Sequence, residues 1–179
     1  MMAAQDDAGA LAASLAELKA YLRIATSDED AVLAALLRGA ASLCEGFIGQ
    51  WLIAREARET IAADGRWHRL SARPVTAISD VRAIGADGVE EALPPGTHAI
   101  DIDASGDGWV RRVGPGDGRR LSVRYRAGMA DDMNGLPEAI RQGIVRLAAD
   151  HHAARDGEGA APPAVVGALW RPWRRMRLA

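Results

Sequence analysis

The sequence predicts an α+β protein: helices from both ends of the chain form one helical bundle, and an antiparallel β-subdomain is inserted between them. Apolar residues recur at helical spacing up to residue 50, and short β-branched runs separated by Gly, Pro and Asp follow. Helical spacing returns after Gly128. The chain therefore divides into N-terminal helices (1–50), an inserted β-subdomain (51–128), C-terminal helices (129–168) and a basic tail (169–179).

Two helices are expected before residue 50. The first carries one leucine stripe, made of Leu11, Leu15, Leu18 and Leu22. The second is expected to begin with Ser27 as N-cap and Asp30 at the capping-box position, and to end near Ile48 because Gly49 breaks it. Its apolar face is expected to contain Leu33, Leu36, Leu37, Ala40, Leu43, Cys44 and Phe47.

The middle of the chain reads as six strands joined by close turns. The candidate strands are 58–62, 67–70, 78–84, 97–102, 108–113 and 120–127. Turns this close together favour an antiparallel meander.

Two helical segments are expected after the strands. Pro137 near the first helical position and Glu138 in the first turn favour a third helix, with Ile140, Ile144, Leu147 and Ala148 on its buried stripe. It is expected to reach about Arg155. Pro162 and Pro163 then favour a short helix or turn through Leu169.

Composition excludes several classes of protein. Hydrophobic residues make up 49% and charged residues 26%, which is typical of a folded soluble chain and favours neither a disordered nor a membrane protein. Cys44 is the only cysteine, so neither an intrachain disulfide nor a thiolate metal cluster can form. The N-terminus lacks the pattern of a secretory signal, and we expect no membrane span and a bacterial cytoplasmic origin.

Three chemical motifs have simpler structural readings. Asp101, Asp103 and Asp107 imitate the start of a calcium loop, but Arg112 stands where a bidentate glutamate is needed, so a polar hairpin is favoured. The glycine-rich run 114–120 lacks the Lys-Ser/Thr of a phosphate loop and also reads as a hairpin. His151 and His152 are adjacent on a helix and cannot both face one metal ion.

Nothing in the sequence indicates catalysis. Cys44 lies on an apolar stripe, where a packed thiol is favoured over a nucleophile. No Ser/His/Asp or Cys/His arrangement stands out, so we predict no catalytic residue, no cofactor and no metal ion, and a protein that is not an enzyme.

The tail is the most unusual segment. Trp and Arg are enriched at interface hot spots, and the tail concentrates both. The candidate partner-binding residues are Trp170, Arg171, Trp173, Arg174, Arg175 and Arg177. A partner-binding role is favoured over a tail folded back on its own domain or a nonspecific nucleic-acid contact.

Several motifs in this order resemble the phage head–tail connector (adaptor) family of long-tailed phages and gene transfer agents. They are Leu18-Lys-Ala-Tyr-Leu-Arg-Ile24, Ser27-Asp-Glu-Asp30, Leu36-Leu-Arg-Gly-Ala-Ala41, Arg73-Pro-Val75 with Val81, Val123-Arg-Tyr-Arg-Ala-Gly128, Leu136-Pro-Glu-Ala-Ile140 through His152 and Arg155, and Ala168-Leu-Trp-Arg-Pro-Trp-Arg-Arg-Met-Arg177. Each motif alone is commonplace, and their order carries the resemblance.

The resemblance implies a structural protein at the head–tail interface of a virion or phage-like particle. It implies a twelve-fold ring beneath the portal protein, extending the DNA channel without sequence-specific binding and meeting a tail-side stopper or tail terminator protein. The tail would bind the portal. The principal alternative is a DNA-packaging accessory or DNA-binding protein, which would use basic surface to contact phosphates. A third possibility is a tail-completion protein that forms a ring lower in the particle.

Two expectations concern the free protein. No long apolar stripe is expected beyond those needed for the core, so self-association should be weak without a template. Pro162, Pro163, Gly167 and Pro172 interrupt helix propagation, so the tail is expected to be mobile until it docks.

Overall fold

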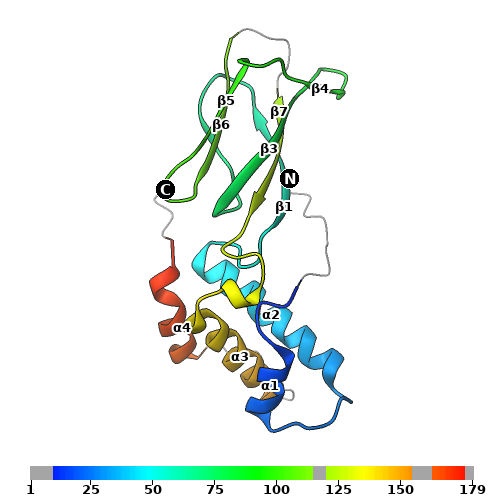
Figure 1. Cartoon of the computed structure of the whole chain (residues 1–179), viewed down its shortest axis with the longest axis vertical. Helices are drawn as coiled ribbons and strands as arrows, with labels where there is room; N and C mark the ends of the chain where they lie inside the picture. Colours follow the sequence, from blue (N-terminus) through cyan, green and yellow to red (C-terminus); the bar gives the residue numbers. More distant parts are fainter. Residues whose placement is uncertain (1–9, 115–119, 155–162, 176–179) are drawn as a thin grey trace. The chain divides into compact units, whose positions relative to one another are not determined.

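The computed structural model describes residues 10–114, 120–154 and 163–175, and it is an α+β protein. These residues form two compact units, one of residues 54–128 and one that combines 10–53 with 129–175. The first is built of strands and the second of helices from both ends of the chain (Figure 1). The predicted fold class, helices from both ends with an inserted antiparallel β-region, is confirmed.

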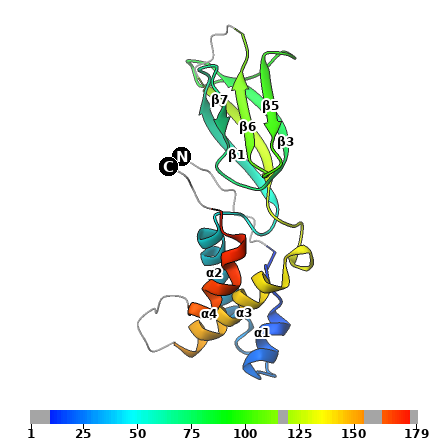
Figure 2. The ribbon, with the colours of Figure 1, turned by 90° about the vertical axis from the view of Figure 1, so that its left-hand side faces the viewer.

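The helical unit is organised around one central helix. Its elements are α1 (Leu15–Leu22), α2 (Asp30–Ile48), η1 (Met133–Gly135), α3 (Glu138–Ala153), α4 (Ala164–Trp170) and η2 (Arg171–Trp173). The helix α3 contacts α1, α2 and α4 (Figure 2). Helices from the start and the end of the chain therefore share one core.

The helix starts follow local chemistry that the sequence only partly reveals. In α1, Ser14 and Glu17 form a complete capping box. The expected N-cap of α2 at Ser27 is wrong: the helix begins at Asp30 with Glu29 as N-cap, and the Ser27 carbonyl accepts the N–H of Asp30 at 3.2 Å. The backbone turn takes the place of side-chain capping. At its other end α2 stops at Ile48, as predicted, with Gly49 in the left-handed region.

One apolar cluster fills the helical unit. The fully buried members of the predicted stripes are Leu18, Leu33, Leu37, Ala40, Cys44, Ile140, Ile144, Leu147 and Ala148. Also fully buried, although on no predicted stripe, are Ala13, Ile48, Leu52, Val166 and Trp170. Leu43 was wrongly assigned to the core, since it is 47% exposed. The buried residues of α2 recur at 33, 37, 40, 44 and 48, which places residue 43 on the flank of the helix, about 100° around the axis from the centre of this stripe.

The β-unit has two antiparallel sheets. The strands are β1 (Arg55–Ala62), β2 (His68–Arg69), β3 (Val75–Ile84), β4 (Glu90–Ala92), β5 (His98–Ile102), β6 (Gly108–Arg112) and β7 (Arg120–Ala127). Their orders are β1-β7-β3-β4 and β2-β6-β5. The expected meander is therefore wrong, because the last strand lies between the first and the third. Turn spacing fixes antiparallel pairing but not which strands become neighbours.

The buried tyrosine Tyr125 of β7 links β1 to the segment that precedes β3. Tyr125 is 1% exposed, accepts the N–H of Ala72 at 3.1 Å and donates its hydroxyl hydrogen to Glu59 Oε2 at 3.0 Å. Burial raises the pKa of the phenol, which therefore stays protonated and serves as the donor to Glu59. The polar end of a core side chain is thus satisfied on both sides.

Candidate partner-binding site

The C-terminal segment, residues 164–175, is held on the helical core by Trp170. This side chain is 1% exposed and packs with Phe47, the two ring centroids being 6.0 Å apart. Its indole Nε1–H donates to the carbonyl oxygen of Ile140 at 3.3 Å. The indole therefore buries its apolar area and satisfies its one polar group.

A glycine on α3 makes room for that indole. A Cβ built on Gly143 would lie 2.2 Å from Trp170 Nε1, far inside van der Waals contact. The lack of a side chain at Gly143 thus allows α4 to lie close against α3. This pairing was not recognised from the sequence; the available signal is a glycine within the apolar stripe that includes Ile140 and Ile144.

The chain stays attached to the core beyond Trp170. The carbonyl of Trp173 accepts the side-chain amide of Gln50 at 2.7 Å, and the N–H of Arg175 donates to the carbonyl of Ile48 at 2.9 Å. The guanidinium of Arg174 lies over the ring of Phe47, 5.4 Å from its centroid. These contacts tie η2 to the end of α2.

Cationic side chains mark the outer surface of this segment. Arg171 and Arg174 are exposed and Arg175 is half-buried, and none of the three has an ion pair within the residues that the structure describes. Trp173 is partly buried against the core beside them. The arrangement leaves positive charge and aromatic area available for an acidic partner. Arg177 lies outside the described residues.

The C-terminal segment has a buried part and an exposed part, whereas the sequence predicted partner contact for the whole segment. Trp170 was expected in partner contact, but it is a core residue, and α4 runs through it past the expected start of the tail at residue 169. The expectation that the tail is mobile in the free protein does not hold for residues 169–175, which are packed and hydrogen-bonded. Proline and glycine interrupt the helix, but tertiary contacts hold the interrupted chain in place.

The calcium-like motif forms a hairpin turn between β5 and β6. Asp103 Oδ1 accepts the N–H groups of Ser105 and Asp107, and Trp109 Nε1 donates to Asp103 Oδ2. Asp107 pairs with Arg73 and Arg69 at 3.3 and 3.7 Å. The carboxylates of Asp103 and Asp107 are used within the fold, and no cluster of three or more metal-ligating side chains occurs among the described residues.

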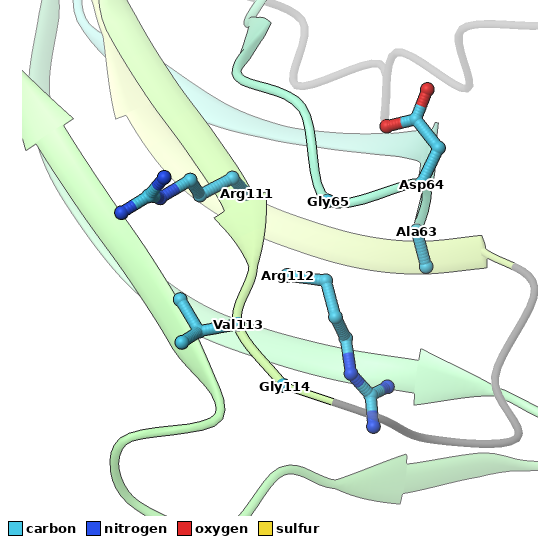
Figure 3. A pocket seen from close by; sticks show the side chains of 7 residues that line it. All are labelled: Ala63, Asp64, Gly65, Arg111, Arg112, Val113 and Gly114. Carbon is cyan, nitrogen blue, oxygen red and sulfur yellow. The ribbon is translucent and has the colours of Figure 1, made fainter.

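The glycine-rich run lies mostly outside the described residues, since only Gly114 and Arg120 at its ends are placed. Next to it is a pocket of about 490 Å³ lined by Asp64, Arg111, Arg112 and their neighbours. Arg111 and Arg112 point in different directions there (Figure 3). Arg111 lies over the ring of Trp67, 4.8 Å from its centroid. The two guanidinium groups therefore do not converge on one ligand position.

The remaining candidates have structural roles. His152 Nε2 lies 3.0 Å from Glu29 Oε2, joining α3 to the start of α2. Cys44 is fully buried, and burial raises the pKa of its thiol, so the nucleophilic thiolate is disfavoured. Both observations fit packing and not catalysis.

Comparison with solved structures gives full-length similarity. A chain in the neck of an empty gene transfer agent (GTA) particle, computed with C6 symmetry, is 26% identical with a TM-score of 0.80. A chain in the neck of the native GTA particle, computed with C12 symmetry, is 27% identical with a TM-score of 0.79. In both cases the similarity covers 100% of this chain and 97% of the other.

A chain in the virion of a native gene transfer agent particle is 29% identical over 94% of this chain and 92% of its own length, with a TM-score of 0.75. No protein-family model and no curated protein matches the sequence. The class that the fold defines is therefore the neck protein of a phage-like particle. The resemblance to the head–tail connector family, inferred from the order of the sequence motifs, is confirmed.

Proposed function

We propose that this chain is a head–tail connector (adaptor) protein with a structural, non-catalytic role at the head–tail interface of a virion or gene transfer agent particle. In this role its subunits form a ring beneath the portal protein, extend the DNA channel, and present a platform to a tail-side stopper or tail terminator protein.

One observation carries the proposal: the similarity to GTA neck chains spans the whole chain and both of its units. A shared single unit would support only a shared fold. Similarity through the helical unit, the inserted sheets and the C-terminal segment supports a shared place in an assembly.

The C-terminal segment supports the portal as the partner. Arg171, Arg174 and Arg175 offer guanidinium groups that have no ion pair among the described residues, beside the partly buried ring of Trp173. Arginine binds carboxylates through two parallel hydrogen bonds, so an acidic portal surface would fit. A ring repeats the contact in each subunit, so modest affinity per segment becomes strong avidity.

Twelve-fold symmetry is the proposed form of the assembled ring, supported by the C12 symmetry of one neck structure. DNA would pass through such a ring without base-specific contacts, because a channel must let the duplex slide. The contacts that hold the ring together are then between proteins and not between protein and DNA.

The proposed function is tested by co-expressing this chain with the portal protein of the same particle and purifying through a tag on the portal. A nuclease-resistant complex with equal numbers of the two subunits is expected. A complex that disappears on nuclease treatment, or DNA binding that weakens steeply with salt, would instead support a DNA-binding accessory protein. Absence of any complex contradicts the adaptor role.

A further inference from the structure

The outward face of α2 is apolar and uncovered in the single chain. Val32 and Leu43 are 45% and 47% exposed on it. The other exposed residues between them and up to the last turn are Ala35, Arg38, Gly39, Ser42 and Gly46. Arg38 is therefore the one charged residue on this stretch. No such face was expected from the sequence, where Leu43 was assigned to the core.

Two glycines on this face have no role in packing the subunit. A Cβ built on Gly39 or Gly46 would meet no atom of a neighbouring segment within 4 Å. Glycine inside a helix costs about 1 kcal/mol of stability relative to alanine. A close approach by a partner would explain why small residues are used where the fold itself leaves open space.

A groove between α1 and α3 offers a second surface, which has apolar side chains within it and charged side chains at its edge. It has a volume of about 320 Å³ and is lined by Tyr21, Val145 and Gln142, with Glu17, Glu138, Arg141 and Arg146 also at its edge. Tyr21 is 58% exposed. The side chains of Glu17 and Glu138 are 48% and 60% exposed, and both lie near Arg141.

The α2 face and the groove are two separate surfaces of the helical unit, with no lining residue in common. The helices α1, α2 and α3 contact one another, so the outer groove between α1 and α3 faces away from α2. The buried residues of α2, Leu33, Leu37 and Cys44, point inward, while its exposed apolar residues face solvent. Closed rings are built from two different complementary patches on each subunit, repeated head to tail.

We propose that the α2 face of one copy of this chain docks into the α1–α3 groove of the next copy, and that this is the contact that builds the ring. The inference rests on the proposed function, because the neck assemblies with C6 and C12 symmetry supply a second copy as the occupant. Leu43 and Val32 meet Tyr21 and Val145, and Gly39 lets the helices approach closely.

Charge supports the same pairing. Arg38 has no ion pair among the described residues. It lies about half-way along α2, at the opposite edge of the exposed face from Leu43. The groove offers two partly exposed carboxylates, Glu17 and Glu138, which share Arg141 as their one ion-pair partner among the described residues, although Arg146 also lies at the edge. An added guanidinium there would give each carboxylate a cationic partner. An α2–α2 contact would instead bring two Arg38 side chains together.

Cysteine crosslinking of the full chain tests the contact. The variants are Gly39→Cys on the α2 face and Gln142→Cys in the groove, with Val165→Cys, an exposed residue of α4, as the matched control site. Under mild oxidation, a mixture of the first two is expected to form crosslinked dimers, while each alone stays at the wild-type background. A double variant should form a ladder of dimers, trimers and higher species, because a head-to-tail contact propagates.

Adding Leu43→Asp to the double variant should remove the ladder without lowering the melting temperature, since the side chain is exposed. The proposal is overturned if Gly39→Cys crosslinks to itself as well as to Gln142→Cys. It is also overturned if the mixture gives no more dimer than Gly39→Cys with Val165→Cys. If crosslinking fails but the portal still captures the chain, this contact alone is wrong; if portal capture fails, the proposed function is wrong.

Discussion

The indole of Trp170 occupies the space in which residue 143 would carry a Cβ: that atom would lie 2.2 Å from Trp170 Nε1. The two residues are far apart in sequence and join α4 to α3. Because the same indole donates to the carbonyl of Ile140, its position is fixed by both packing and a hydrogen bond. The relationship explains why the C-terminal segment is part of the helical core.

Gly143→Ala should destabilise the helical unit. The added methyl group forces the indole or α3 to shift, and overpacking of this kind costs about 1–3 kcal/mol. Gly39→Ala is the matched control, since it adds the same methyl group to a helix where nothing lies within 4 Å, and it should stabilise the chain by up to about 1 kcal/mol. Urea unfolding of the two variants measures both effects, and equal stabilities would refute the close fit at Gly143.

Trp170→Ala should lower the free energy of unfolding by about 3–5 kcal/mol, because it removes a fully buried side chain. The sequence-based hypothesis of a mobile docking tail required almost no change in melting temperature. Arg171→Ala changes an exposed residue of the same segment and should stay within about 0.5 kcal/mol of the wild type. Calorimetry of the isolated chain distinguishes the two results, and an unchanged melting temperature for Trp170→Ala would restore the mobile tail.

Tyr125→Phe should destabilise the β-unit by about 1–3 kcal/mol, because the buried N–H of Ala72 loses its acceptor and Glu59 loses a donor. The same change at Tyr21 removes a hydroxyl from an exposed ring, so Tyr21→Phe should be nearly neutral. Chemical denaturation provides the comparison. If the two variants lose equal stability, the hydroxyl of Tyr125 has no structural role.

The pKa of Asp64 lies below its ordinary value because the side chain of His68 hydrogen-bonds to it, with the N–H of Arg66 as a second cause. A carboxyl whose folded pKa is lowered stabilises the fold above its unfolded pKa, and this contribution is lost as the pH falls through the folded pKa. His68→Ala should raise the pKa of Asp64 in an NMR titration of the carboxyl carbon. An unchanged titration curve would show that the histidine contact is absent in solution.

The sequence predicted where the helices and strands lie along the chain better than it predicted which strands pair with one another. Apolar periodicity located α1, α2 and α3, because a helix is specified by residues close in sequence. The strand order was wrong because β7 pairs with both β1 and β3, and that choice depends on packing between distant segments. The strand β4, Glu90–Ala92, was missed because its three residues carry no apolar alternation.

The candidate site was predicted in composition but not in arrangement. The concentration of Trp and Arg correctly drew attention to the C-terminal segment, but sequence cannot tell a tryptophan that faces a partner from one that faces its own core. Trp170 faces its own core because Gly143 leaves room for the indole there. These two residues become neighbours only in the folded chain. Likewise, Leu43 looked like a core residue because it adjoins Cys44, but one residue along a helix is a rotation of about 100°, which exposes Leu43.

Portal capture by a charge-reversed C-terminal segment tests the central claim most directly. In the variant Arg171→Glu with Arg174→Glu, two exposed cations become anions. The isolated chain should lose no more than the about 0.5–1 kcal/mol of the contact between Arg174 and Phe47, while binding to the portal protein is lost. Arg120→Glu with Arg124→Glu, a matched reversal of two exposed arginines of β7 that have no ion pair among the described residues, should retain binding. Stable portal binding by the C-terminal variant would contradict the docking role assigned to this segment, and failure of the wild-type chain to bind the portal would contradict the adaptor role itself.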